Sequence, residues 1–475
     1  MSQAIIRRTW LLTPLVAAVA ACYGALVAAQ PKVALLIVVG IVYVAAVGWM
    51  AFFAPVAHLL CLLVLTTVLP YSLQHGFSTH PGLLPSDVFL LTGLLRAGLV
   101  LSRSPMDARQ RWTLGLIFAF EVIVLYAAVK GYRAGRSVST VGAEARTLMG
   151  YTVAFICMAT LRGDGAKQRL ATAMLVLGLL IGLLGVAQWT LHLQLSDSQD
   201  FGLRPGVSFT SGGVGQIQGG LFSFPLCVLI SASVLASGSV RSRSARLWVI
   251  AALGLNLFAL LVTFERTIWV ATAVGLVLVI ARSKGLRRMK AIIWTVVIAT
   301  AAAAALSIAS PATVQTAVQR FTSIGQFSTD DSLRQRAVES RHVIHAIRAA
   351  PFTGSGLAAS VWFGRPWQQV PPRAYTYSHN GYLWLAWRLG VIGAALLFAV
   401  VLLAISWRGP PPGDHTLAAL RAGSQISLLV LLIASLTFPP FSGFGSTCAL
   451  GLLIGICAQT PSRPGVRTTT SSSAA

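Results

Sequence analysis

Acidic residues are scarce in this chain, which has 12 aspartates and glutamates against 36 lysines and arginines in 475 residues. Charged residues make up only 10 % of the sequence and hydrophobic residues 56 %, and the mean hydropathy is +0.76. A water-soluble domain usually has about 25 % charged residues, so this composition excludes one. The sequence also lacks any long polar block that would form a separate soluble module.

Cysteine pairs and metal-ligand clusters are lacking as well. The cysteines all fall within apolar runs, with neither disulfide nor metal-ligand spacing; they are Cys22, Cys61, Cys157, Cys227, Cys448 and Cys457. The eight histidines form no metal-binding pattern either. We therefore expect no metal site and no cofactor. The formal net charge of +24 is expected mainly in cytoplasmic loops, and it does not indicate a nucleic-acid partner.

Long apolar runs dominate the sequence and predict an all-α, polytopic integral membrane protein, because a helix needs about 20 apolar residues to cross a bilayer. The runs lie at roughly 10–29, 33–49, 52–70, 86–101, 112–129, 147–161, 168–188, 219–237, 247–264, 267–281, 291–309, 381–406, 424–440 and 445–459. We expect about 12–14 spanning helices. They would form a single membrane domain, residues 1–460, followed by a disordered cytoplasmic tail, residues 461–475.

The basic residues of the short loops predict the orientation in the membrane. With alternating crossings these loops fall on one side, which is then cytoplasmic; they lie near residues 103–111, 162–169, 241–246 and 282–290. Both termini are then cytoplasmic. Four larger polar segments fall outside, and the longest is a large extracytoplasmic loop; they are roughly 71–85, 130–146, 189–218 and 310–380.

The large outer loop is rich in arginine. Residues 310–379 contain seven arginines and no lysine, against three acidic residues, and guanidinium forks suit bidentate phosphate binding. Within it, residues 331–351 predict an amphipathic helix on the outer membrane surface. Its apolar face is expected at Leu333, Ala337, Ile344 and Ile347, and its basic face at Arg334, Arg341, His345 and Arg348. The basic face would either bind a polyanionic ligand or lipid headgroups, or simply be solvated.

His379 and Asn380 lie at the point where this polar loop ends and a long apolar run begins. His379 is therefore expected near the N-terminus of a membrane helix. The partial positive charge there disfavours an imidazolium, and a neutral imidazole can accept a proton. Gly390 and Gly393, one turn apart in the same run, are expected where membrane helices pack closely.

Two further arginines are candidates on the same side of the membrane. Arg204, held extended by Pro205, opens a glycine-rich segment whose N–H groups can face an anion. Arg266 lies in a hairpin with almost no loop, next to Glu265 and close to Trp269. A charge this close to hydrocarbon indicates function. The alternatives are neutralisation by Glu265, or a side chain that extends to the interface beside Trp269.

These landmarks, in this order over roughly 200–400, resemble the O-antigen ligase and O-antigen polymerase superfamily. They are the Arg204 turn, the Arg266 hairpin, the long outer loop with its helix, and His379-Asn380 followed after nine residues by Gly390 and then Gly393. The turn at 351–356 also resembles the Pro-x-x-Gly-x-Gly turn of the superfamily. The members are membrane transferases that move glycans off polyprenyl-diphosphate carriers such as undecaprenyl diphosphate.

The resemblance implies a metal-independent, inverting glycosyl transfer on the outer face of the cytoplasmic (inner) membrane. Arg204 and Arg266 would bind the diphosphate leaving group, and His379 would be the general base on the acceptor hydroxyl. Asn380 would orient the acceptor or His379. The acceptor would be lipid A core in lipopolysaccharide synthesis, another cell-surface acceptor, or a growing glycan chain.

Other classes of membrane protein fit less well. GT-C glycosyltransferases need acidic residues in the first outer loop, and here that loop is about 30–32, with no acid. Cell-wall polymerases of the shape and division family use a loop aspartate, which Asp330 and Asp331 leave possible, but the His379 motif does not fit them. A lipid-linked oligosaccharide flippase would have a similar number of helices, and it stays the alternative function.

Overall fold

The computed structural model describes residues 31–68, 84–162, 165–191, 210–211, 214–215, 222–240, 242–283, 285–322, 331–365, 370–407 and 415–459. Three of the sequence predictions lie outside the described residues. They are the apolar run at 10–29, Arg204 with most of its glycine-rich segment, and the tail at 461–475.

The described residues up to 191 form helices joined by short connections. These helices are α2 (Pro31–Phe53), α3 (Pro55–Thr67), α5 (Pro85–Ser102), α6 (Ala108–Arg133), α7 (Val138–Met149), a 3-10 turn (Gly150–Thr152), α8 (Val153–Thr160) and α9 (Ala166–Thr190). Prolines begin α2, α3 and α5, where the missing N–H has no helical partner to lose. Asp107 caps α6 by accepting from Gln110 N at 2.8 Å.

The second half adds helices and two short antiparallel hairpins. The helices are α10 (Ser223–Ser237), α11 (Arg243–Val262), α12 (Arg266–Arg282), α13 (Leu286–Ala309), α14 (Pro311–Thr322), α15 (Asp331–Ala349), α16 (Gly381–Ser406), α17 (His415–Ala434) and α18 (Phe444–Cys457). The strands are β1 (Thr210–Ser211), β2 (Val214–Gly215), β3 (Val361–Arg365) and β4 (Val370–Tyr375), paired β1 with β2 and β3 with β4.

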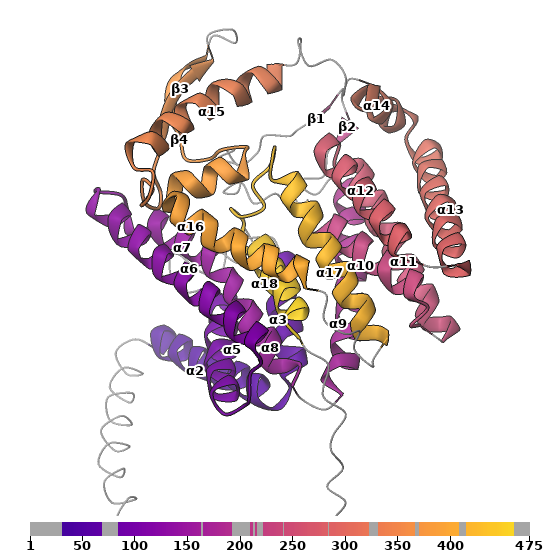
Figure 1. Ribbon diagram of the computed structural model, residues 1–475, viewed down its shortest axis with the longest axis horizontal. Helices are drawn as coiled ribbons and strands as arrows, with labels where there is room; N and C mark the ends of the chain where they lie inside the picture. The colour runs from indigo at the N-terminus through magenta and orange to yellow at the C-terminus, as the bar shows by residue number, and fades with distance from the viewer. Residues whose placement is uncertain are drawn as a thin grey trace, which may run out of the picture.

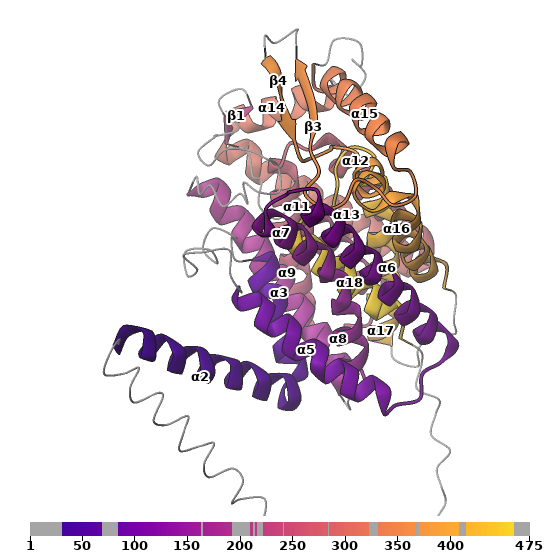
Figure 2. The same cartoon turned by 90° about the vertical axis from the view of Figure 1, so that its left-hand side faces the viewer.

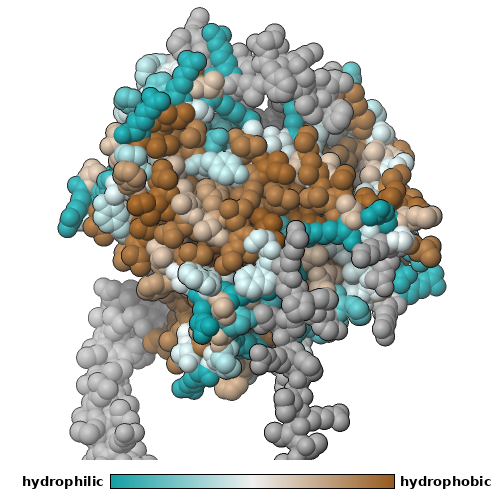
Figure 3. Space-filling model, in the orientation of Figure 1, coloured by the Kyte–Doolittle hydropathy of each residue, from teal (hydrophilic) through white to brown (hydrophobic). Residues whose placement is uncertain are grey.

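The prediction of an all-α polytopic membrane protein is confirmed. In the described residues, seven helices are long and apolar enough to cross a membrane and four shorter helices are apolar. A broad apolar band crosses the surface between more hydrophilic ends, as a lipid-facing belt requires (Figure 3). Of the other predicted runs, 10–29 is not described, and α8 and α12 have only 8 and 17 residues.

The region predicted as a large outer loop forms a cap over one end of the helix bundle. The cap consists of α14, α15 and the β3–β4 hairpin (Figures 1 and 2). The sequence predicts one amphipathic helix here and does not predict the hairpin. Aromatic residues explain it, because Phe363 and Tyr375 stack across the two strands at 4.0 Å between ring centroids. His342 of α15 packs against Phe363 at 5.6 Å.

The buried face of α15 differs from the predicted one. Glu339 and Val343 are buried, whereas Ala337 and Ile344, expected on the apolar face, are exposed. The helix is therefore rotated relative to the orientation expected from its hydrophobic residues, because the acidic side chain of Glu339 is turned towards the bundle.

Helix α16 is broken at Gly390, where φ is 73° and ψ is 174°, a conformation that essentially only glycine adopts. The two pieces of α16 run in different directions (Figure 1). The close-packing role expected of Gly390 is therefore wrong: it is a break, and the backbone of Phe352 lies against it. Gly393 does face a neighbouring helix, since a Cβ there would lie 3.0 Å from Ile123 of α6.

The segment after α15, residues 351–359, fills this break, and we call it the strap. Val391 N donates to Pro351 O at 2.8 Å, Ser355 N to Trp387 O at 2.7 Å and Gly356 N to Arg388 O at 3.1 Å. The break frees these α16 groups from helical bonding, and the strap supplies their partners.

Replacing Gly390 by alanine should prevent the strap from docking. A Cβ at this position would lie 2.1 Å from Phe352 O, and the positive φ adds strain. We expect Gly390→Ala to cost about 3 kcal/mol or more of stability, seen as a lower midpoint of thermal unfolding in detergent. Gly115→Ala in α6 is the control, since nothing lies within 4 Å of its added methyl. Equal midpoints for both variants would show that the break is not needed.

Candidate functional site

His379 lies directly before the first turn of α16, as the sequence predicts. Asn380 is the N-cap residue, and its side-chain oxygen accepts from Leu383 N at 3.0 Å. Ser378, fully buried, accepts from Asn380 N at 3.3 Å. Gly381 N donates to Ser435 O at the end of α17, at 2.8 Å. Capping and these bonds hold the His379 backbone in one position.

Glu339 of α15 makes two contacts with His379. One carboxylate oxygen accepts from His379 N at 2.5 Å, and the other lies 2.7 Å from His379 Nδ1. The carboxylate side chain is 3 % exposed and the imidazole 28 % exposed. The acid is therefore shielded from water while the ring retains an accessible edge.

This geometry fixes which ring nitrogen can act as a base. An ionised carboxylate only accepts hydrogen bonds, so the neutral imidazole carries its hydrogen on Nδ1 and its lone pair on Nε2. If Nε2 takes up a proton, the buried carboxylate stabilises the resulting imidazolium. The Tyr377 ring packs nearly perpendicular to the imidazole, with centroids 5.1 Å apart, and limits its rotation.

Arg388 holds together the segments around His379. Its buried guanidinium donates to Glu144 Oε1 of α7 at 2.5 Å, and also to the carbonyls of Ala359 and Thr376. It lies 3.9 Å from the ring centroid of Trp387. The strap, α7 and the segment leading into His379 are thus fixed to one side chain.

Two cations from the end of α6 bind the strap from the other side. Lys130 Nζ donates to Thr353 Oγ1 at 2.9 Å, and Arg136 Nη1 donates to Ser355 O at 2.9 Å. Burial lowers the pKa of the Arg136 guanidinium, and the nearby Glu144 opposes this shift. The strap is therefore clamped between α6 and α16.

Arg266 is the first residue of α12, in the short hairpin that the sequence predicts after α11. The positive φ of Phe264, 54°, makes the turn, and Trp269 Nε1 closes it by donating to Leu260 O at 2.7 Å. Arg266 is half-buried. Helix α17 packs against both α12 and α16, so the helix that begins at Arg266 and the helix that His379 precedes share α17 as a neighbour.

The four predicted ligand-binding residues of α15 are all exposed; they are Arg334, Arg341, His345 and Arg348. They share the helix with Glu339 but not its buried face. Arg336, one turn before Glu339, is half-buried, and its Nε is buried with no hydrogen-bond partner among the described residues. Arg336 is thus a further cation beside the site.

Sequence reasoning missed Glu339, Glu144 and Arg388 as site residues. One sequence signal was available for Glu339. Residues 310–379 contain seven arginines, and Glu339 is the only glutamate in that segment. A lone acid on a basic helix in an acid-poor chain indicates a specific partner. No local signal indicated the pairing of Arg388 with Glu144.

A histidine–carboxylate pair beneath a cationic cap, at one end of a polytopic helix bundle, defines a membrane protein with a candidate acid–base site. Residues 250–398 match the family model described as O-antigen ligase. The match includes Arg266, the cap and the His379 motif, and it confirms the resemblance to the O-antigen ligase and polymerase superfamily. A comparison with curated protein sequences finds no match.

Removing the Arg388 guanidinium should destabilise the site region strongly. Arg388→Met leaves Glu144 and two backbone carbonyls without their donor, and breaking a buried ion pair on one side costs about 3–5 kcal/mol. We expect a lower midpoint of thermal unfolding and partial recovery when Glu144→Gln is added. The exposed Arg133, changed to Met, is the control. Additive effects of the two site substitutions would contradict the pairing.

Proposed function

We propose that this protein is a metal-independent, inverting glycosyltransferase of the O-antigen ligase/polymerase type. It would transfer a glycan from a polyprenyl-diphosphate carrier to an acceptor hydroxyl at the outer face of the cytoplasmic membrane. The observation that carries the proposal is the contact of His379 Nδ1 with buried Glu339 at 2.7 Å, within the region that matches the O-antigen ligase model.

The pair supports general-base catalysis. His379 Nε2 takes the proton of the acceptor hydroxyl as its oxygen attacks the anomeric carbon, and Glu339 stabilises the imidazolium. The bond between the anomeric carbon and the diphosphate oxygen breaks, and the polyprenyl diphosphate leaves with both bonding electrons. Attack opposite the leaving group inverts the anomeric centre.

Cations would stabilise the charge that develops on the leaving diphosphate. Arg266, at the N-terminus of α12, combines a guanidinium with the positive end of a helix. Arg204 is proposed for the same role from the resemblance alone. Arg336, one turn from Glu339 on α15, is a further candidate that the structure adds. Asn380, which caps α16, would act by orienting His379 rather than by binding the acceptor.

The base can be tested by in vitro transfer from a polyprenyl-diphosphate glycan in the presence of EDTA. We expect His379→Ala to lower kcat by about 100- to 10,000-fold. Glu339→Gln should also reduce kcat, because an amide can donate to Nδ1 and then leaves the hydrogen on Nε2. His342→Ala, an exposed histidine of the same helix as Glu339, is the control.

The outcome separates the candidate functions. Normal transfer by His379→Ala would overturn the assigned base, and loss of wild-type transfer in EDTA would overturn metal independence. If the lipid-linked donor binds but no acceptor is glycosylated, a flippase becomes the better interpretation. Whether lipid A core or a second glycan chain is consumed distinguishes a ligase from a polymerase.

The exposed basic face of α15 would bind the anionic donor or a charged glycan. We expect Arg341→Gln and Arg348→Gln to raise KM for the donor several-fold with little change in kcat, since exposed charges contribute to binding rather than to the chemical step. The KM of the wild type should rise with ionic strength. Arg243→Gln, exposed at the other end of the bundle, should leave KM unchanged. Equal KM values for all variants would show that this face is only solvated.

A further inference from the structure

A second group of buried charges lies at the end of the bundle opposite His379. His379 precedes α16 and Trp407 follows it, so the second piece of α16, residues 391–406, separates the two places. Around Trp407 lie Arg109, in the first turn of α6, and Arg421, in the second turn of α17. Arg109 is 2 % exposed and Arg421 6 % exposed. Two guanidinium groups are thus buried at one helix-bundle end.

These arginines are only partly satisfied. Arg109 Nη1 donates to Gln459 O at 3.4 Å, and its guanidinium carbon lies 3.6 Å from the centroid of the Trp407 ring. Nη2 of Arg109 and Nη2 of Arg421 are both buried and have no hydrogen-bond partner in the described part of the chain. Buried donors on charged groups are costly to leave unpaired.

Among the described residues, negative charge does not balance this pair. Arg109 and Arg421 act on each other electrostatically, and Asp107 is the carboxylate that acts on Arg109. One oxygen of Asp107 caps α6, and the other has no hydrogen-bond partner among the described residues, so it binds neither arginine. The C-terminal end of α18 adds only about half a negative charge. The carboxylates of the described residues therefore leave both guanidinium groups without an ion-pair partner.

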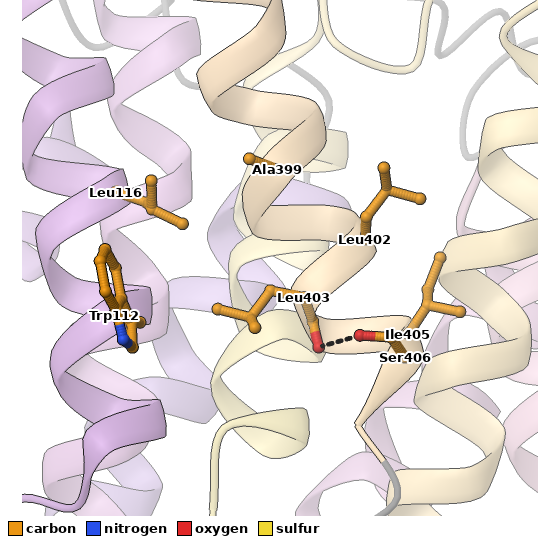
Figure 4. Close-up of a pocket in the computed structure, with 7 residues that line it drawn as sticks. All are labelled: Trp112, Leu116, Ala399, Leu402, Leu403, Ile405 and Ser406. Carbon is orange, nitrogen blue, oxygen red and sulfur yellow. Dashed lines mark hydrogen bonds between the residues drawn. The ribbon is translucent and has the colours of Figure 1, made fainter.

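An apolar groove lies between α6 and α16 (Figure 4). It has a volume of about 530 Å³ and is lined by Trp112 and Leu116 of α6 and by Ala399, Leu402, Leu403 and Ile405 of α16.

Trp112 faces Leu403 across the groove (Figure 4). Arg109, Trp112 and Leu116 recur at three- and four-residue spacing and so share one face of α6. On α16 the lining ends at Ser406, directly before Trp407. Both walls of the groove therefore continue into the contact between Arg109 and Trp407.

We propose that the groove and the two arginines bind an anionic phospholipid of the leaflet at this end of the bundle. One hydrocarbon chain lies in the groove, and the lipid phosphate accepts from Nη2 of Arg109 and of Arg421. The groove opens to the lipid side, since Trp112 is 65 % and Leu402 56 % exposed. Trp112 and Trp407 suit the level of the headgroups. This site is separate from the His379 site and does not depend on the transferase proposal.

The test is lipid binding to full-length protein delipidated in a neutral detergent, measured by native mass spectrometry and by the shift in thermal unfolding. The probes are dioleoylphosphatidylglycerol, dioleoylphosphatidylcholine and inorganic phosphate. We expect the wild type to bind dioleoylphosphatidylglycerol, which carries a net negative charge, more tightly than the zwitterionic dioleoylphosphatidylcholine. Arg109→Gln and Arg421→Gln should each weaken that binding about tenfold. Arg111→Gln, an exposed neighbour on α6, is the matched control and should bind as the wild type does.

A groove variant keeps the test decisive if an arginine variant does not fold. Ala399→Trp fills the groove and leaves both arginines in place. It should therefore abolish the binding of dioleoylphosphatidylglycerol. Equal binding of the two lipids by the wild type would overturn the proposal, as would unchanged binding by Ala399→Trp. If inorganic phosphate raised the midpoint of thermal unfolding as much as dioleoylphosphatidylglycerol does, the site would bind free phosphate and not a lipid.

Discussion

The guanidinium of Arg388 donates to acceptors from three segments that are far apart in the sequence. They are the Glu144 carboxylate of α7, the Ala359 carbonyl of the strap and the Thr376 carbonyl just before His379. A buried guanidinium that loses these acceptors is strongly destabilised, so the three segments have to assemble together. The position of the proposed base thus depends on a contact that takes no part in the chemistry.

In this acid-poor chain, three carboxylates of the described residues each pair with one specific basic side chain. Glu339 pairs with His379, Glu144 with Arg388, and Asp87 at the start of α5 with Arg146 at 3.0 Å. The exposed arginines of α15 have few other acids to neutralise them. The positive electrostatic potential that these arginines create over the cap would attract the proposed anionic donor and hold its diphosphate near His379.

The sequence predicted those parts of the structure that depend on local patterns. Runs of apolar residues located the helices, and the change from polar to apolar residues placed His379 at the start of α16. The contacts that the sequence did not reveal are non-local. Glu339 and His379 are 40 residues apart, and Glu144 and Arg388 are 244 apart. Gly390 was misread because a glycine in an apolar run serves equally as a packing residue or as a break.

The break at Gly390 also sets how far His379 extends beyond the second piece of α16. A straight helix rises 1.5 Å per residue, so residues 381–389 would carry His379 roughly 13 Å further along the axis of the second piece. Because α16 changes direction at Gly390, this rise does not lie along the axis of the second piece. A polyprenyl carrier cannot lift its diphosphate far above the headgroups, because its chain stays in the hydrocarbon. For the proposed polyprenyl-diphosphate donor, folding the first piece over would bring the imidazole closer to the height of the diphosphate.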